Sequence, residues 1–145
     1  MSSETIEYWN PLVPELSVSD LEISLHFYLA MGFSIRFRRE KPPFAYLELG
    51  QAQIMLEQIH EEAWISGDLQ PPFGRGTNFQ IEVENALSMA NQANDLNIPL
   101  FRPIREIWYT VSQNKEEGQI EFLVQDPDGY LLRFSQPLGT RIADT

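Results

Sequence analysis

The side chains that most often perform metal or nucleophilic chemistry are scarce in this chain. It contains no cysteine, which excludes disulfides, cysteine nucleophiles and cysteine-based metal sites. The two histidines are His26 and His60, and no supporting motif completes a serine, histidine and acid set. Gly74-Arg-Gly76 is too short for a phosphate-binding loop and is not followed by the Lys-Ser/Thr pair of one. The residues therefore indicate no nucleophilic or phosphate-loop enzyme.

Neither histidine stands where its spacing favours a metal ligand. His60 follows Glu57 by three residues, a spacing that brings two side chains together on a helix. The residues from Gln53 to Gln58 alternate as a strand, where an offset of three places the side chains on opposite faces. His26 falls inside an expected helix, as a core or surface residue. We expect neither histidine to hold a metal.

The charge of the chain bears on its partners. Lys and Arg total 10 against 21 Asp and Glu, a formal net charge of −11. Such a surface repels phosphate backbones, so nucleic acid is not an expected partner, and it attracts cationic ligands. No apolar run approaches the roughly 18 residues of a membrane span. The N-terminal residues are polar and acidic without an apolar segment, so we expect a cytoplasmic protein with no membrane partner.

The first half of the chain predicts one strand, one helix and three further strands. Ser19 is expected to cap the helix, with Glu22 three residues later completing a capping box, and Gly32 is a natural residue to end it. The helix carries apolar residues on two edges, which indicates packing on more than one side. The expected segments are an arm at 1–11, strands at 12–18, 33–39, 44–49 and 53–58, and a long irregular connection at 60–77.

The second half repeats this order with little residue identity. Asn85 is expected to cap a helix that ends at Asn97 and Pro99. Asp128-Gly129 between two apolar runs is a strong hairpin signal. The expected strands are 78–83, 104–111, 119–124 and 130–135. The sequence therefore predicts a single α+β domain over residues 1–145, with one βαβββ module at 12–59 and a second at 78–137, paired around a curved mixed-sheet cleft.

Two stretches resemble a known superfamily. Val18-Ser-Asp-Leu-Glu-Ile-Ser-Leu-His-Phe-Tyr28 with Met31-Gly-Phe33 resembles the first-helix signature of the vicinal oxygen chelate superfamily. Phe122-Leu-Val-Gln-Asp-Pro-Asp-Gly-Tyr-Leu-Leu-Arg-Phe134 resembles its last hairpin. That superfamily contains glyoxalase I, extradiol dioxygenases and the bleomycin resistance proteins, and its glyoxalase/bleomycin resistance fold is the expected fold. The bleomycin resistance proteins are the branch that the chain resembles most.

The resemblance also locates the four metal-ligand positions of the superfamily. They match Val13, Glu57, Asn78 and Arg133 in this sequence. Valine cannot ligate a metal, and arginine has five donors but no lone pair to offer. One carboxylate and one amide do not make a divalent metal site. The resemblance therefore implies that no metal or other cofactor is bound, and that Glu57 and Arg133 face each other in the cleft.

The expected function is that of a metal-independent small-molecule binding protein. By resemblance it is a homodimer that sequesters a cationic or aromatic ligand, such as a cationic glycopeptide antibiotic, with no catalytic residue. Planar groups stack on aromatic rings, and the expected ligand-binding residues are Phe44, Tyr46, Glu57, Asn78, Trp108 and Arg133. Trp64 and Phe73 on the connection are candidates for a lid or a dimer contact.

Two alternatives stay open. One is a metal-dependent lyase or dioxygenase of the same superfamily, and the other is an interaction module without a small ligand. Bleomycin binders often carry a tryptophan before the strand that leads into the final turn. The matching residues, Lys115 to Gln119, contain none. The missing tryptophan argues against bleomycin as the ligand and leaves the expectation of small-molecule binding in place.

Overall fold

A computed structural model describes residues 8–143 as two four-stranded mixed sheets with two helices. The strand orders are β1-β4-β3-β2 and β5-β8-β7-β6, so both units repeat one topology. The first strand of each unit runs parallel to its last, and the other pairs are antiparallel. The α+β architecture of two βαβββ modules is confirmed. Residues 1–7 of the expected N-terminal arm lie outside the described residues.

The elements follow the expected order along the chain. The first module consists of β1 (Glu15–Val18), α1 (Leu21–Ala30), β2 (Ser34–Glu40), β3 (Pro43–Leu49) and β4 (Ala52–Gln58). The second consists of β5 (Asn78–Glu82), α2 (Ala86–Asp95), β6 (Leu100–Ser112), β7 (Lys115–Gln125) and β8 (Leu131–Ile142). Residues 59–77 between the modules form no helix and no strand before the start of β5, as expected.

The helix caps show one error of the sequence analysis. Asn85 caps α2 as predicted, by accepting a hydrogen bond from Ser88 N. The cap of α1 is Asp20 and not Ser19, because the Asp20 carboxylate accepts from Glu22 N and Ile23 N. Both helices have ten residues, and between residues 8 and 143 no helix is long and apolar enough to cross a membrane.

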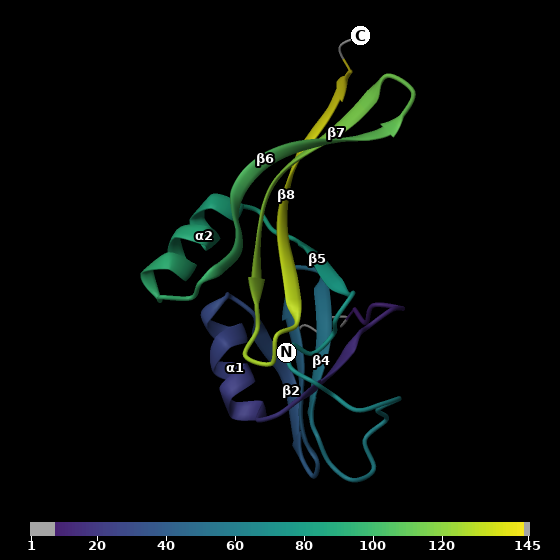
Figure 1. Ribbon diagram of the computed structural model, residues 1–145, viewed down its shortest axis with the longest axis vertical. Coiled ribbons are helices and arrows are strands. Elements are labelled where there is room, and N and C mark those ends of the chain that lie inside the picture. Colours follow the sequence, from purple (N-terminus) through teal and green to yellow (C-terminus); the bar gives the residue numbers. More distant parts are fainter. Residues whose placement is uncertain (1–7, 144–145) are drawn as a thin grey trace, which may run out of the picture.

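The core lies between the helices and one face of each sheet (Figure 1). Tyr28 of α1 and Phe33 are in edge contact at 5.2 Å, and Phe33 meets Phe134 of β8 at 6.4 Å. Phe134 stacks on Phe122 of β7 at 5.4 Å. One apolar cluster therefore joins the two modules. The second apolar edge expected on α1 is only partly covered, because Ile23 remains 58% exposed.

The turn between β7 and β8 fastens the second module to the first. The buried Asp126 carboxylate accepts hydrogen bonds from Tyr28 Oη at 2.7 Å and from the backbone N–H groups of Asp128 and Tyr130. Tyr130 Oη donates to Ser17 O, and Ser19 donates from its backbone and hydroxyl to Asp128. Ser19 thus serves this contact in place of the helix cap.

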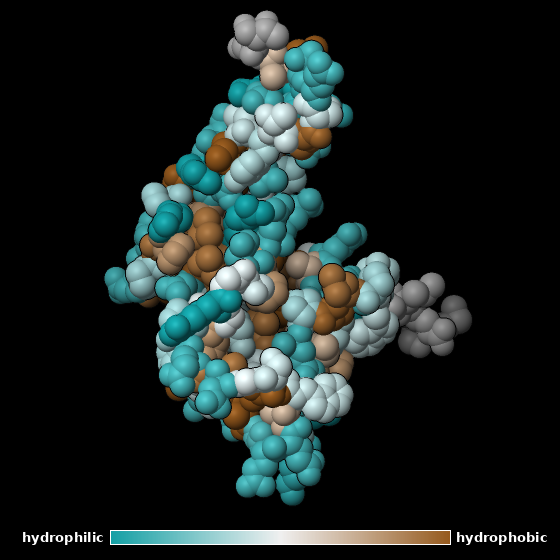
Figure 2. Space-filling model, turned by 45° about the vertical axis from the view of Figure 1, so that its right-hand side comes forward, coloured by the Kyte–Doolittle hydropathy of each residue, from teal (hydrophilic) through white to brown (hydrophobic). Residues whose placement is uncertain are grey.

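Strands β6 to β8 extend beyond the rest of the molecule as a three-stranded arm (Figure 1). These strands are longer than the sequence predicted, since β6 begins at Leu100, β7 begins at Lys115 and β8 runs to Ile142. On the face that Figure 2 shows, the arm is mostly hydrophilic with separate hydrophobic residues. Residues 112–118 are all polar or glycine, and they hid this extension because an exposed strand has no buried face to mark it.

Candidate functional site

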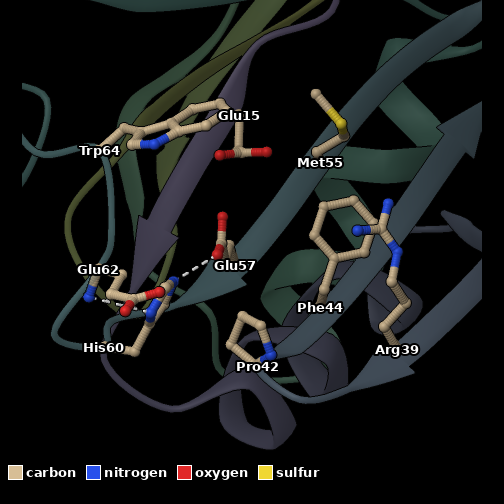
Figure 3. Close-up of a pocket in the computed structure, with 9 residues that line it drawn as sticks. All are labelled: Glu15, Arg39, Pro42, Phe44, Met55, Glu57, His60, Glu62 and Trp64. Carbon is tan, nitrogen blue, oxygen red and sulfur yellow. Dashed lines mark hydrogen bonds and ion pairs between the residues drawn. The ribbon is translucent and has the colours of Figure 1, made fainter.

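A pocket of about 430 Å³ opens on the face of the first sheet that is turned away from α1. It combines carboxylates, aromatic rings and one guanidinium. Figure 3 shows its lining from β1, β2, β3, β4, the turn between β2 and β3 and the connection after β4: Glu15, Arg39, Pro42, Phe44, Met55, Glu57, His60, Glu62 and Trp64. The mixture suits a ligand with a charged group and a planar apolar part.

Strand alternation places the pocket residues. Leu16 and Val18 of β1 are buried in the core, so Glu15 and Ser17 between them face the opposite side. Glu57 of β4 is the register partner of Ser17 and therefore lies on the same face as Ser17 and Glu15. Phe44 of β3 pairs with Glu57 across the sheet. Three neighbouring strands thus bring two carboxylates and one ring to a single surface.

Glu57 and His60 are hydrogen-bonded, which the sequence analysis did not expect. His60 Nε2 lies 2.6 Å from Glu57 Oε1. The argument from strand alternation failed because β4 ends at Gln58 and the chain turns back, so that His60 is no longer on the strand. Its Nδ1 accepts from Glu62 N at 3.3 Å, which leaves Nε2 as the donor to Glu57. The imidazole therefore orients the Glu57 carboxylate.

Glu15 and Glu57 face each other across the pocket (Figure 3). Burial raises the pKa of Glu15, and the neighbouring Glu57 raises it further, while Arg39 and His60 oppose the shift. The Arg39 guanidinium lies 4.3 Å from the centre of the Phe44 ring, in a cation–π contact. A cation placed between the two carboxyl groups would relieve their repulsion.

Phe44 and Tyr46 are 3% and 5% exposed but belong to no part of the main core. They lie on the pocket side of β3, where Phe37 stacks on Tyr46 at 5.4 Å and is tilted against Phe44 at 5.7 Å. Tyr46 Oη donates to Gln53 Oε1 at 2.6 Å. Phe44 therefore lines the pocket, and Tyr46 lies beside it.

Arg133 lies in the second sheet and pairs with a buried acid. Its Nε is 3.7 Å from Glu121 Oε2, and its terminal nitrogen donates to Gln80. Arg105 is 3.7 Å from the other Glu121 oxygen, which also accepts from Tyr109 Oη. Burial raises the pKa of Tyr109, and the bond to Glu121 adds to the shift, so the phenol stays a donor. Arg133 was expected to face Glu57, but Glu57 is hydrogen-bonded to His60.

Asn78 and Trp108 lie apart from the pocket. Asn78 begins β5 and is exposed. Trp108 is on the arm, where Arg141 lies 4.0 Å from its ring centre and its Nε1 donates to Glu106. The ring covers Gly118, whose missing Cβ would fall 2.6 Å from it. Of the expected site residues, the structure brings Phe44 and Glu57 together, with Tyr46 adjacent.

The residues that the resemblance places at metal-ligand positions do not fit a metal ion. The Glu57 carboxylate is held by an imidazole donor, and Arg133 occupies its place with a guanidinium aimed at Glu121. Across residues 8–143, no group of three or more acidic or histidine side chains is arranged to hold a metal. The donor set is therefore that of a polar pocket and a structural ion pair.

Sequence reasoning missed several pocket residues. Glu15 carried a usable signal, since it precedes Leu16 and Val18 at strand spacing and must face away from them. Arg39 and Met55 follow from the same alternation on β2 and β4. Glu121 carried no signal, because an acid in an alternating strand normally indicates a solvated face.

Solved structures share the fold over almost the whole chain. A virulence protein from Salmonella typhimurium has a TM-score of 0.62 at 20% identity, over 92% of this chain and 98% of that one. TioX from Micromonospora sp. ML1 has a TM-score of 0.63 at 17% identity, over 94% and 100%. A glyoxalase/bleomycin resistance protein/dioxygenase from Alicyclobacillus acidocaldarius has 0.60 at 16%, over 89% and 92%.

These likenesses establish the fold. No family model matches the chain, and no curated protein matches it either. The expectation of a glyoxalase/bleomycin resistance fold is thus confirmed by structure. At these identities the fold alone is shared, so function must be argued from the pocket.

Proposed function

We propose that the protein is a metal-independent binding protein for a small planar organic cation. The ligand places its cationic group between Glu15 and Glu57 and lays its planar part against Phe44 and Met55. Charge-assisted hydrogen bonds to carboxylates supply the polar recognition, and ring stacking supplies the apolar part. The formal charge of −11 favours the approach of cations.

The observation that carries this proposal is the pairing of two facing carboxyl groups with a buried ring in one pocket. Glu15 and Glu57 come from adjacent strands, and Phe44 from the next strand forms the adjoining wall (Figure 3). The residues that the resemblance places at metal positions do not fit a metal. In this proposal the ligand therefore supplies the positive charge that balances the two carboxyl groups.

A second copy of the chain completes the site in this proposal. The face of the second sheet that is turned away from the core carries Arg105 and Arg133 around one acid, Glu121, whereas the pocket on the first sheet carries Glu15 and Glu57 with one guanidinium, Arg39. Two faces of opposite charge favour each other in a symmetric pair, and a homodimer was expected from the resemblance. A cytoplasmic location is kept as part of the proposal on the sequence alone.

The proposal predicts binding of benzamidine, whose amidinium carries two N–H donors on a phenyl ring. In calorimetric titration, benzamidine binds and the neutral isostere benzamide does not. Glu57→Gln weakens benzamidine binding by roughly ten- to a hundredfold, since a hydrogen bond to a charged group is lost. Glu84→Gln removes one charge from an exposed site in the second module and leaves the affinity unchanged. Equal binding of the two probes would reject the proposal.

A narrower version of the proposal follows from the resemblance to the bleomycin resistance proteins. In that version the ligand is a cationic glycopeptide. Titration with metal-free bleomycin tests it, with binding at micromolar concentration expected. An absence of heat would leave benzamidine binding untouched and remove antibiotic sequestration from the proposal.

One observation favours the alternative of a metal-dependent lyase or dioxygenase. Glu57 and His60 are two potential ligands in direct contact at 2.6 Å. Elemental analysis of protein purified without chelators separates the two functions, because the binding protein contains no stoichiometric divalent ion. The remaining alternative, an interaction module, would show no rise in melting temperature with any cationic aromatic compound.

A further inference from the structure

Beside the pocket, the first sheet carries a second aromatic surface, which we call the aromatic slot. It is formed by Phe37 and Tyr46 on the pocket face and by Arg36. Phe37 also contacts Phe44 at 5.7 Å, and Phe44 lines the pocket. Tyr46 is the register partner of Met55, another pocket residue. The slot and the pocket are therefore neighbouring parts of one continuous surface.

The indole of Trp9 occupies the slot. Its ring meets Tyr46 edge-on at 4.9 Å and Phe37 at 6.0 Å. The Arg36 guanidinium lies 3.8 Å from its centre. Trp9 thus makes the contacts that a planar ligand group would make there.

The segment that carries Trp9 covers the slot from outside and is held by hydrogen bonds on both sides of the indole. Asn10 N donates to Gln53 Oε1 at 2.8 Å, and Asn10 Nδ2 donates to Gln51 O at 2.9 Å. Tyr8 O accepts from Gln53 Nε2 at 2.7 Å and from Arg36 Nη1. Trp9 is itself 46% exposed, whereas Tyr46 beneath it is 5% exposed. Trp9 is therefore reached from solvent, whereas Tyr46 is reached only where the indole leaves it.

The cation in the slot selects the kind of ring. A guanidinium over a ring attracts electron-rich π faces, and indole is the best of the natural rings. The pocket next to it offers the opposite chemistry, since Glu15 and Glu57 favour a positive group. One elongated molecule would satisfy both, with a cationic end and an electron-rich aromatic end.

We propose that the slot is a second ligand subsite for an electron-rich aromatic ring, and that Trp9 occupies it until such a ring displaces the indole. This inference rests on the proposed function, because the cationic end of the same ligand lies in the pocket. Short ligands bind beside Trp9, and elongated ones bind at the expense of its contacts.

Two probes with the same amidinium group test the subsite: benzamidine, and a 2-phenylindole that carries one amidinium. Trp9→Ala removes the competing indole, so it raises the affinity for the phenylindole roughly tenfold, the equivalent of about 1.4 kcal/mol. It leaves the affinity for benzamidine unchanged. In the double variant with Tyr46→Ala the gain disappears, because the slot itself is lost. Phe101→Ala, at an exposed aromatic residue near the start of β6, changes neither affinity.

A direct readout keeps the test independent of the folding of any variant. In the wild-type protein the Trp9 indole N–H signal in NMR shifts on addition of the phenylindole and stays in place with benzamidine. Unchanged or weakened phenylindole binding in Trp9→Ala, or an unmoved Trp9 signal, overturns the subsite while benzamidine binding still supports the pocket. If neither probe binds the wild-type protein, the proposed function fails and the subsite fails with it.

Discussion

Replacement of Arg133 by methionine is expected to lower the free energy of unfolding by about 3 kcal/mol, because it removes one of the two guanidiniums that neutralise the buried Glu121 charge. Glu121 is fully buried, and Arg133 Nε is 3.7 Å from its Oε2. Arg105 and Tyr109 remain beside the other oxygen and keep the loss at the low end of the range for broken buried pairs. Urea unfolding of the purified variant measures the change.

Two further variants separate the ion pair from general damage. Arg133→Met combined with Glu121→Leu recovers most of the loss, since apolar replacement of a whole buried pair is often neutral or stabilising. Arg102→Met is the matched control, an exposed arginine whose contacts are with its own neighbour Phe101. A loss in Arg133→Met no larger than in Arg102→Met would show that the Glu121 pair does not stabilise the fold.

Asp126 is expected to make the stability of the protein depend on pH between about 4 and 6. Burial raises the pKa of Asp126 to about 6, although hydrogen bonds from Tyr28 and two backbone amides oppose the shift. The folded state therefore keeps a proton that the unfolded chain has already lost. Stability from this group falls as the pH rises through that window, by about 3 kcal/mol for a shift of about two units.

The Asp126→Asn variant removes this dependence. Asparagine can accept from the backbone N–H groups of Asp128 and Tyr130 through its oxygen, and its amide can donate to Tyr28. The difference in unfolding free energy between wild type and Asp126→Asn then changes with pH from 4 to 6 and is constant above. Asp68→Asn, in the exposed part of the connection, shows no such change. A difference that stays level across the window would contradict the role of Asp126.

The sequence predicted the fold where periodicity and turn chemistry agree. Asn85 before an apolar helical pattern and Asp128-Gly129 between two apolar runs lie in the structure where their local chemistry requires. The first helix shows the limit of this reasoning. Ser19 and Asp20 are both good caps, and the choice fell to Asp20 because Ser19 bonds to Asp128 more than a hundred residues away.

The candidate site was only partly predictable. The resemblance pointed to Glu57, and the need for a stacking ring pointed to Phe44; their common face follows from the pairing of β3 with β4. The bond between Glu57 and His60 depends on where β4 ends, and strand boundaries are the least certain part of such reasoning. The partner of Arg133 depends on the pairing of β7 with β8, which places Glu121 within its reach. No local pattern shows that an acid will be buried.

Two positions that the resemblance assigns to metal ligands have other contacts in this structure. Arg133 forms an ion pair with Glu121. Glu57 has His60 and Glu15 as its neighbours. Both sets of contacts preserve strand pairing, because the side chains lie on the sheet faces that are turned away from the core.

The central claim is that the pocket binds an organic cation without a metal, and one measurement tests it most directly. Benzamidine is titrated by calorimetry into protein stripped with a chelator, and again after a stoichiometric divalent ion is added. The account predicts the same affinity in both titrations and no binding of benzamide in either. Binding that appears only after the divalent ion is added would contradict it.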